Sequence, residues 1–182
     1  EEEIQKIWDM VHTFYKSFDF KLELRLSLRN PETPEKYLGN KEHWNKAEEI
    51  LKKIAKENKT KYVEVPGEAA FYAPKLDFIG TDSIGREWQV ATIQLDVYMP
   101  ESFDLYCINE KGEKERIVMI HAAIAGSLER CAAVLIEHYE GNFPLWDEAV
   151  KKYINGLKNG DKPYKGRYIG TLVADLHRTI LK

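Results

Sequence analysis

Apolar side chains recur at two different spacings in the first third of the chain. Residues 3–17 repeat them at helical spacing, which predicts a helix with one buried face. Residues 21–28 carry leucine at every second position, which predicts a half-buried strand of an antiparallel sheet. Residues 41–57 return to helical spacing behind Asn40, a residue type that caps helix N-termini. The pattern therefore predicts a helix, a strand and a second helix.

The middle of the chain is rich in strand patterns. Short apolar runs bounded by glycine, proline or polar turns predict strands at residues 62–65, 75–80, 88–98, 103–108 and 116–121. A strongly apolar helix is predicted at 128–139 and is expected to be buried on most sides, and an amphipathic helix at 147–157 follows. Residues 168–182 are predicted to form a final strand or helix. Helices flanking a mostly antiparallel sheet indicate the α+β class.

The composition narrows the class of protein. With 182 residues, of which 43% are hydrophobic and 31% charged, the chain has the size and composition of one globular domain. It contains no apolar run of membrane-spanning length, and the acidic start Glu1-Glu2-Glu3 differs from a signal peptide. Two cysteines make no disulfide framework. We therefore expect a cytoplasmic protein that does not enter a membrane.

The charge pattern argues against nucleic-acid binding. The net charge is −3, so the chain as a whole offers no basic field to a polyanion. The Lys-rich stretch at 151–165 is explained at least as well by a solvated helix and loop. We therefore do not expect this chain to bind tRNA.

Three stretches carry a specific family signature. They are GEAAFYAPKLDF at 67–78, GREWQVATIQLD at 85–96, and VMIH at 118–121 followed by GSLER at 126–130, LIEHY at 135–139 and FPLW at 143–146. In this order and spacing they resemble the second half of the class II aminoacyl-tRNA synthetase catalytic core, in its threonyl-tRNA synthetase form. The resemblance covers residues 4–146 of an expected single domain, 1–182. Residues 147–182 do not resemble the family's anticodon-binding domain, and we expect them to pack on the core.

The resemblance implies an antiparallel sheet flanked by helices, with ATP and the amino acid on one face. Arg130 matches the family's motif 3 arginine, which contacts the ATP phosphates, and Lys75 and Tyr72 match residues at the rim of the amino-acid pocket. A guanidinium at a helix start has the charge and the donors to bind a polyphosphate. By resemblance, Arg130 and Lys75 are the catalytic candidates, and Tyr72 and Arg130 are ligand-binding candidates.

Two glutamines complete the ligand-binding candidates. Gln89 and Gln94 match glutamines that line the nucleotide and amino-acid sites of the family. They are an odd number of positions apart in one predicted strand, so an unbroken strand would point them to opposite faces. Either a local β-bulge brings both to one face, or one of them is a surface residue.

The sequence also departs from the family. His121 matches one of three zinc ligands, where zinc binds the amine and hydroxyl of threonine, but the other two ligands and motifs 1 and 2 are missing. Ser102 and Ala122 stand where the family has arginine, and Ala73 where it has glycine. We therefore expect an engineered or diverged derivative that has lost aminoacylation and retains neither ATP nor zinc, which are implied only by the resemblance.

Purely structural roles compete with two of these assignments. Arg130, at a predicted helix start, is also consistent with an ion pair to Glu129 or Asp96. His121, without its partner ligands, is expected to be a strand histidine whose ring contacts a backbone carbonyl.

The two cysteines have one chemical interpretation and one structural one. Cys131 is a candidate nucleophile with His121 or His138 as its base, but we prefer a small buried residue on an apolar helix. Cys107, on a predicted strand, is likewise expected to pack.

Three functions remain open at this point. The first is a folded scaffold or designed protein without aminoacylation activity. The second is a minimal enzyme that forms an aminoacyl-adenylate, with Arg167 or Arg178 supplying the missing cation. The third is a protein-interaction module in which an exposed sheet edge drives self-association.

Overall fold

In the computed structural model of the protein, residues 1–140 and 147–159 are described. The chain divides into two compact units, residues 1–138 and 139–182, which are taken separately. In the second unit, α5 spans Glu148–Asn159, close to the helix predicted at 147–157. The FPLW motif at 143–146 and the element predicted at 168–182 lie outside the described residues, and the packing of residues 147–182 on the core stays a prediction. No helix in the described ranges is long and apolar enough to span a membrane.

The first unit is built on a five-stranded sheet with the order β2-β1-β3-β4-β7. Its strands are β1 (Leu22–Leu28), β2 (Tyr62–Pro66), β3 (Lys75–Thr81), β4 (Glu87–Asp96) and β7 (Met119–Ala123). β1 and β2 run parallel, whereas the β1–β3, β3–β4 and β4–β7 pairs are antiparallel. The mostly antiparallel sheet with its helices confirms the predicted α+β class.

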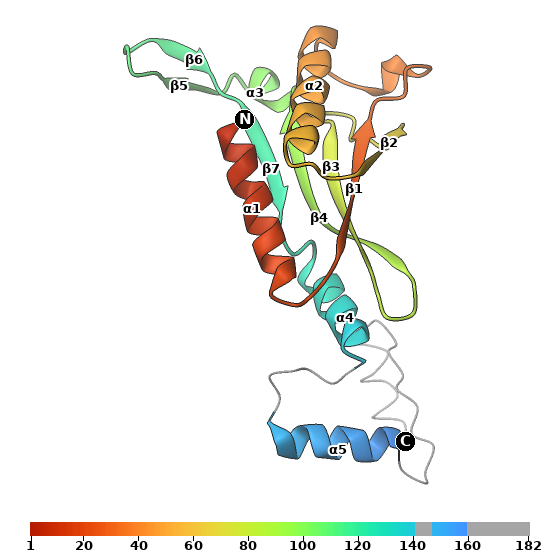
Figure 1. The fold of residues 1–182 in the computed structure, drawn as a ribbon. Coiled ribbons are helices and arrows are strands. Elements are labelled where there is room, and N and C mark those ends of the chain that lie inside the picture. The colour runs from red at the N-terminus through yellow and green to blue at the C-terminus, as the bar shows by residue number, and fades with distance from the viewer. Residues whose placement is uncertain (141–146, 160–182) are drawn as a thin grey trace, which may run out of the picture. The chain divides into compact units, whose positions relative to one another are not determined.

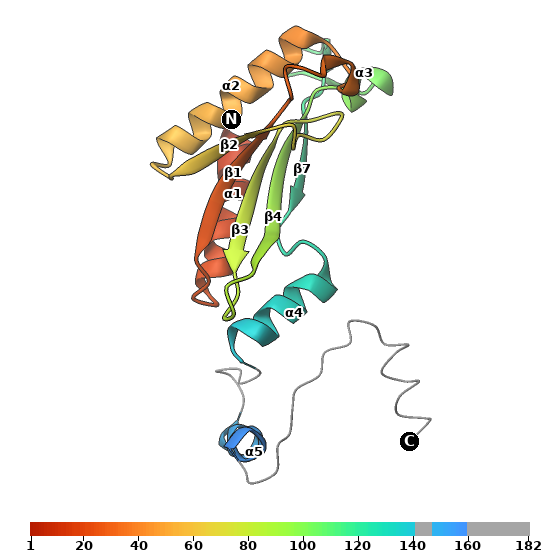
Figure 2. The ribbon, with the colours of Figure 1, turned by 90° about the vertical axis from the view of Figure 1, so that its right-hand side faces the viewer.

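Two long helices, α1 (Glu2–Lys16) and α2 (Lys41–Glu57), lie on the same face of this sheet (Figures 1 and 2). α2 begins where the sequence predicts, because the Asn40 side chain accepts a hydrogen bond from the Glu42 backbone N–H at 2.7 Å. In both views the opposite face of the sheet is not covered by a helix of residues 1–138. We call these the covered face and the open face.

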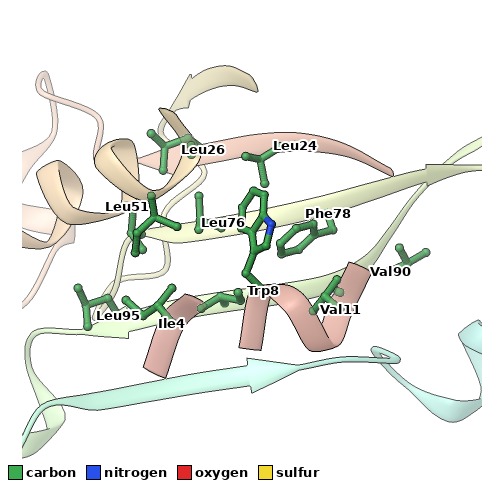
Figure 3. Close-up of a cluster of buried hydrophobic side chains, with 14 of the residues drawn as sticks. Ile4, Trp8, Val11, Leu24, Leu26, Leu51, Leu76, Phe78, Val90 and Leu95 are labelled. Atoms are coloured by element: carbon green, nitrogen blue, oxygen red, sulfur yellow. The ribbon is translucent and has the colours of Figure 1, made fainter. Parts of the chain in front are cut away.

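The covered face carries the hydrophobic core, whose side chains come from α1, α2 and alternate positions of the strands (Figure 3). Trp8 of α1 meets Phe78 of β3 edge to face, with ring centroids 5.2 Å apart. Leu24, Leu26 and Leu28 of β1 are buried here, as their alternation predicts. The strand period therefore separates apolar side chains on the covered face from the polar side chains on the open face.

The connections after β4 differ from the predicted strands. β4 ends at Asp96 rather than at Tyr98, because Asp96 Oδ1 accepts hydrogen bonds at 2.8 Å from the backbone N–H groups of Tyr98 and Met99 and turns the chain into a short helix, α3 (Met99–Ser102). A hairpin of β5 (Tyr106–Ile108) and β6 (Lys114–Arg116) follows. The strand predicted at 116–121 is thus divided between β6 and β7.

The helix predicted to be buried on most sides, α4 (Leu128–His138), has a single buried residue, so that prediction was wrong. Val134 is its buried residue, whereas Leu128 is 78% exposed and Ile136 is 43% exposed. α4 follows β7 and extends past the end of the strands (Figure 1), so the sheet covers only one side of it. An apolar sequence indicates that a helix has a surface suited to burial, but it does not show which other element packs against that surface.

Candidate functional site

A β-bulge in β4 brings both candidate glutamines to the open face. The register of β3 against β4 shifts between Phe78 and Ile79, which leaves Val90 as an extra residue in β4. The extra residue resets the alternation of side chains, so Gln89 and Gln94 point to the same side. Of the two alternatives that the sequence leaves open, the structure contains the bulge.

Asp77 of β3 lies among the polar side chains of the open face and is itself buried. Its Oδ1 accepts hydrogen bonds from Gln89 Nε2 at 2.8 Å and from Thr92 Oγ1 at 2.9 Å. Its Oδ2 accepts a hydrogen bond from Ser27 Oγ at 2.7 Å and lies 3.1 Å from Lys75 Nζ. A buried carboxylate is stable only when its charge is paired and its oxygens are hydrogen-bonded. This network satisfies both conditions and holds Lys75 and Gln89 in place.

A second polar group lies beside the first, across β4 and β7. The Tyr72 hydroxyl donates to Gln94 Oε1 at 2.9 Å, and the Tyr72 ring meets the His121 ring edge to face. His121 pairs with Gln94 across the strands, and its Nε2 lies 2.7 Å from Asp96 Oδ2. Because Gln94 also pairs with Lys75, the two groups form one continuous polar surface.

Arg130 reaches the open face from the first turn of α4. Its exposed guanidinium donates from Nη1 to the backbone carbonyl of Gln89 at 3.3 Å. Gly126, just before the helix, has a φ of 60°, and a Cβ there would lie 3.1 Å from the Val90 carbonyl oxygen. Glycine thus lets the loop approach the bulge closely. The same irregularity in β4 therefore positions both Gln89 and Arg130.

The observed contacts of two site candidates differ from the structural roles considered above. Arg130 bonds to the Gln89 carbonyl instead of to Glu129 or Asp96. His121 contacts the carboxylate of Asp96 rather than a backbone carbonyl. Both side chains therefore make polar contacts with residues of β4.

Neither cysteine has the features of a nucleophile. Burial raises the pKa of the Cys131 thiol, which opposes formation of the reactive thiolate. His138 Nε2 lies 3.1 Å from the Phe18 carbonyl oxygen. Cys107 is exposed on the β5–β6 hairpin, so the expectation that it packs in the interior was wrong.

The turn between β3 and β4 is held by a second buried carboxylate, Asp82. Its oxygens accept hydrogen bonds from the backbone N–H groups of Ile84 and Arg86, from Arg86 Nε and from the Trp88 indole. Burial raises the pKa of Asp82, but the bonds from Trp88, Arg86 and Ile84 outweigh burial and lower the pKa to about 2. This turn fixes one end of the β3–β4 pair that carries Asp77 and Gln89.

The described residues do not fit a complete zinc site. In the ranges 1–140 and 147–159, no three His, Cys, Asp or Glu side chains lie close enough to share a metal ion. A catalytic zinc needs three protein ligands. His121, the candidate ligand, has its Nε2 against Asp96. These residues offer at most one ligand of the zinc site that the resemblance implies.

Sequence reasoning missed the residues that organise the open face. Asp77 was not singled out, although a carboxylate within the apolar run of 75–80 is a signal of a paired or functional group. Ser27 and Thr92 carry no such signal, because a hydroxyl in a strand is common and its partner depends on register.

Comparison with known families gives two matches. The tRNA synthetase class II core domain (G, H, P, S and T) matches residues 1–139. The C-terminal domain of fructose-1-6-bisphosphatase matches residues 134–182, which is less than half of the chain and does not define its family.

Individual relatives agree with the first match. The threonine–tRNA ligase of Synechocystis is 48% identical over 147 residues, covering 80% of this chain and 24% of the ligase. That of Symbiobacterium thermophilum is 42% identical over 172 residues, covering 94% of this chain and 26% of the ligase. The chain thus spans about a quarter of the length of these relatives.

Solved structures give the same answer for the fold. A structure described as the RNA binding domain of threonyl-tRNA synthetase from Cryptosporidium parvum Iowa II superposes with a TM-score of 0.72 at 30% identity, covering 99% of this chain and 48% of that one. A putative threonyl-tRNA synthetase from Aeropyrum pernix gives a TM-score of 0.59 at 28% identity, covering 96% and 47%. The chain therefore belongs to the class II tRNA synthetase core-domain family and corresponds to part of the threonyl-tRNA synthetase core.

Proposed function

We propose that the open face is the remnant of a site for ATP and threonine, the substrates of threonine–tRNA ligases, and that this chain retains at most weak affinity for ATP. One observation carries this proposal: the bulge at Val90 gathers Gln89, Gln94 and Arg130 onto the face that also holds Lys75. The residues come from β3, β4 and α4, and the buried Asp77 holds two of them, Lys75 and Gln89. A face that presents amide, ammonium and guanidinium groups together suits a ligand with both polar and anionic parts.

Each side chain has a defined task in this proposal. The Arg130 guanidinium, exposed at the start of α4, binds phosphate oxygens through its forked donors. Lys75 Nζ uses one contact for Asp77 and has further donors for a carboxylate or phosphate. Gln94, held by Tyr72, and His121, held by Asp96, form the border of the amino-acid end.

We further propose that this chain is an engineered or diverged derivative that binds weakly and does not aminoacylate on its own. Activation of threonine develops negative charge on the phosphates, and cations around that charge lower the barrier. On the described part of the open face, Lys75 is balanced by Asp77 and Arg25 by Glu87, which leaves Arg130. Family arginines are replaced by Ser102 and Ala122.

The alternative is a minimal enzyme whose missing cations come from Arg167 or Arg178, which lie outside the described residues. We propose a cytoplasmic location for either form, because Cys107 and Cys131 are free thiols that suit a reducing compartment.

A ligand screen with two readouts tests the proposal. Thermal unfolding is measured with ATP, threonine, zinc and a threonyl-adenylate analogue in which a sulfamate replaces the phosphate, since a ligand of the folded state raises the unfolding temperature. We expect the analogue to raise it and threonine-dependent ATP–pyrophosphate exchange to be absent. No shift with any ligand would contradict the binding proposal, and measurable exchange would favour the minimal enzyme.

A second candidate function is self-association through the outer edge of β7. In the described chain β7 pairs only with β4, and its sequence Met-Ile-His-Ala-Ala contains none of the lysines or prolines that usually protect an edge strand. We expect sedimentation to show association that rises with protein concentration, and Ala122→Lys to reduce it. A monomer at all concentrations would exclude this function.

A further inference from the structure

The hydrogen-bond network around Asp77 has only one consistent arrangement of donors and acceptors. An ionised carboxylate accepts hydrogen bonds and cannot donate them. Thr92 Oγ1, 2.9 Å from Asp77 Oδ1, must therefore donate its single proton to Asp77. With that proton committed, the same hydroxyl can only accept from its other neighbour, the Gln89 side chain at 2.6 Å.

The side-chain amide of Gln89 is therefore fixed in one of its two possible orientations. We call this fixed orientation the lock. Its Nε2 lies 2.8 Å from Asp77 Oδ1 and 2.6 Å from Thr92 Oγ1, and only an N–H donor suits both of these neighbours. The opposite orientation would place Oε1 against the carboxylate, where two acceptors would repel each other. Gln89 consequently presents its carbonyl oxygen, an acceptor, away from Asp77.

Gln94 has the opposite orientation in the structure, where its partner is a hydroxyl rather than a carboxylate. Its Oε1 accepts the Tyr72 hydroxyl proton at 2.9 Å, so its amide nitrogen is the group left for a ligand. Gln94 pairs with Lys75, whereas Gln89 lies beyond the bulge near Arg130. The open face therefore carries an acceptor at the Arg130 end and a donor at the Lys75 end.

We propose that Asp77 is a positioning residue that sets this polarity, and that the ligand meets Gln89 with a donor such as an amine or hydroxyl and Gln94 with an acceptor such as a carbonyl or carboxylate oxygen. This rests on the proposed function of the open face and deepens it. Asp77 does not touch the ligand; it acts through Lys75, Thr92 and Gln89. Lys75 Nζ, 3.1 Å from Oδ2, pairs with the charge of this buried carboxylate.

The lock can be measured without any ligand. The chain contains three glutamines, Gln5, Gln89 and Gln94, so the side-chain amide signals of Gln89 can be assigned by NMR. We expect its two N–H signals to differ strongly in shift and to exchange slowly with water. In Asp77→Asn they should collapse to the position and exchange rate of exposed glutamine. Asp82→Asn removes a comparable buried carboxylate at the β3–β4 turn and should leave them unchanged.

Thr92 provides a second pair of variants in case Asp77→Asn does not fold. Thr92→Val keeps the shape but removes the hydroxyl, whereas Thr92→Ser keeps the hydroxyl. We expect the threonyl-adenylate analogue to bind about tenfold more weakly to Thr92→Val, as befits loss of a hydrogen bond in a charged network. Thr92→Ser should restore both the Gln89 signals and the affinity.

The outcomes separate the two proposals. If the Gln89 signals are unchanged in both Asp77→Asn and Thr92→Val, the positioning role is overturned. If the signals change as expected but the analogue does not bind the unaltered protein, the lock exists and the proposed function of the face fails. If Thr92→Val and Thr92→Ser bind the analogue equally weakly, packing rather than the hydroxyl is responsible, which also overturns the role.

Discussion

The two faces of the sheet use the same strands for opposite purposes. On the covered face, Leu76 and Phe78 of β3 are buried against α1 and α2 with no polar partner to satisfy. On the open face, Asp77 of the same strand is equally buried but depends on hydrogen bonds from three side chains and an ion pair with a fourth. Apolar burial tolerates many sequences of similar volume, whereas the polar network requires each member in one position. The comparison teaches that stability is concentrated on one face and chemical specificity on the other.

The largest expected effect on the free energy of unfolding comes from removing a buried side chain of the covered face. Phe78→Ala removes a ring that is 1% exposed and contacts Trp8, so we expect the free energy of unfolding to fall by about 3–5 kcal/mol. Phe103→Ala, at a phenylalanine 66% exposed, should change it by less than about 0.5 kcal/mol. Urea unfolding measures both; equal losses would show that the covered face is not the main source of stability.

A smaller effect on the free energy of unfolding is expected at the turn between β3 and β4. The pKa of Asp82 is lowered to about 2, below its ordinary value of 3.8, so its carboxylate stabilises the fold above about pH 4. We expect this contribution, about 2 kcal/mol, to be lost as the pH falls from about 4 toward 2. Asp82→Asn should be less stable at neutral pH and lack this acid transition. Asp104→Asn, at an exposed carboxylate, is the control and should retain it.

The covered face also contains a histidine whose pKa is lowered by burial. Burial lowers the pKa of His12, although the nearby Asp9 opposes this, and among the described residues His12 Nε2 has no hydrogen-bond partner. The unfolded chain therefore binds this proton more readily, and stability should fall as the pH drops below about 6.5. His12→Leu should reduce the loss of unfolding free energy between pH 7 and 5. His43→Leu, at an exposed site, should not reduce it.

The smallest effect on stability, but a clear one on binding, is expected at Arg130. Its side chain is exposed and makes one long hydrogen bond, so Arg130→Ala should change the unfolding free energy by less than about 0.5 kcal/mol. Affinity for ATP should nevertheless fall by about tenfold, since a charged hydrogen-bond donor to phosphate is lost. Lys46→Ala, an exposed cation of α2, is the matched control. If calorimetry gave Arg130→Ala and the unaltered protein the same affinity for ATP, Arg130 would not be part of the site.

Much of the covered face was predictable because it depends on local rules. α2 was predicted at its observed bounds, Lys41–Glu57, since periodic apolar positions and the Asn40 cap act within a few residues of one another. The burial of Leu24 and Leu26 follows from alternation alone. The exposure of α4 was not predictable in this way, because it depends on what lies beside the helix.

The open face was predictable only in its candidates and not in its geometry. Family resemblance pointed to Gln89, Gln94 and Arg130, but whether they share a face depended on the extra residue Val90 in the β3–β4 register. A bulge has no sequence signature when it contains no glycine. The role of Asp77 arises from four partners on β1, β3 and β4, which only the folded chain brings together.

The most direct test of the account is a titration of the protein with the threonyl-adenylate analogue, followed by backbone and side-chain NMR shifts. The account predicts saturable changes confined to open-face groups, foremost the side chains of Lys75, Gln89 and Gln94, with α1 and α2 unaffected. Shifts that cluster on the helices, or no saturable shift at any concentration of analogue, would contradict it.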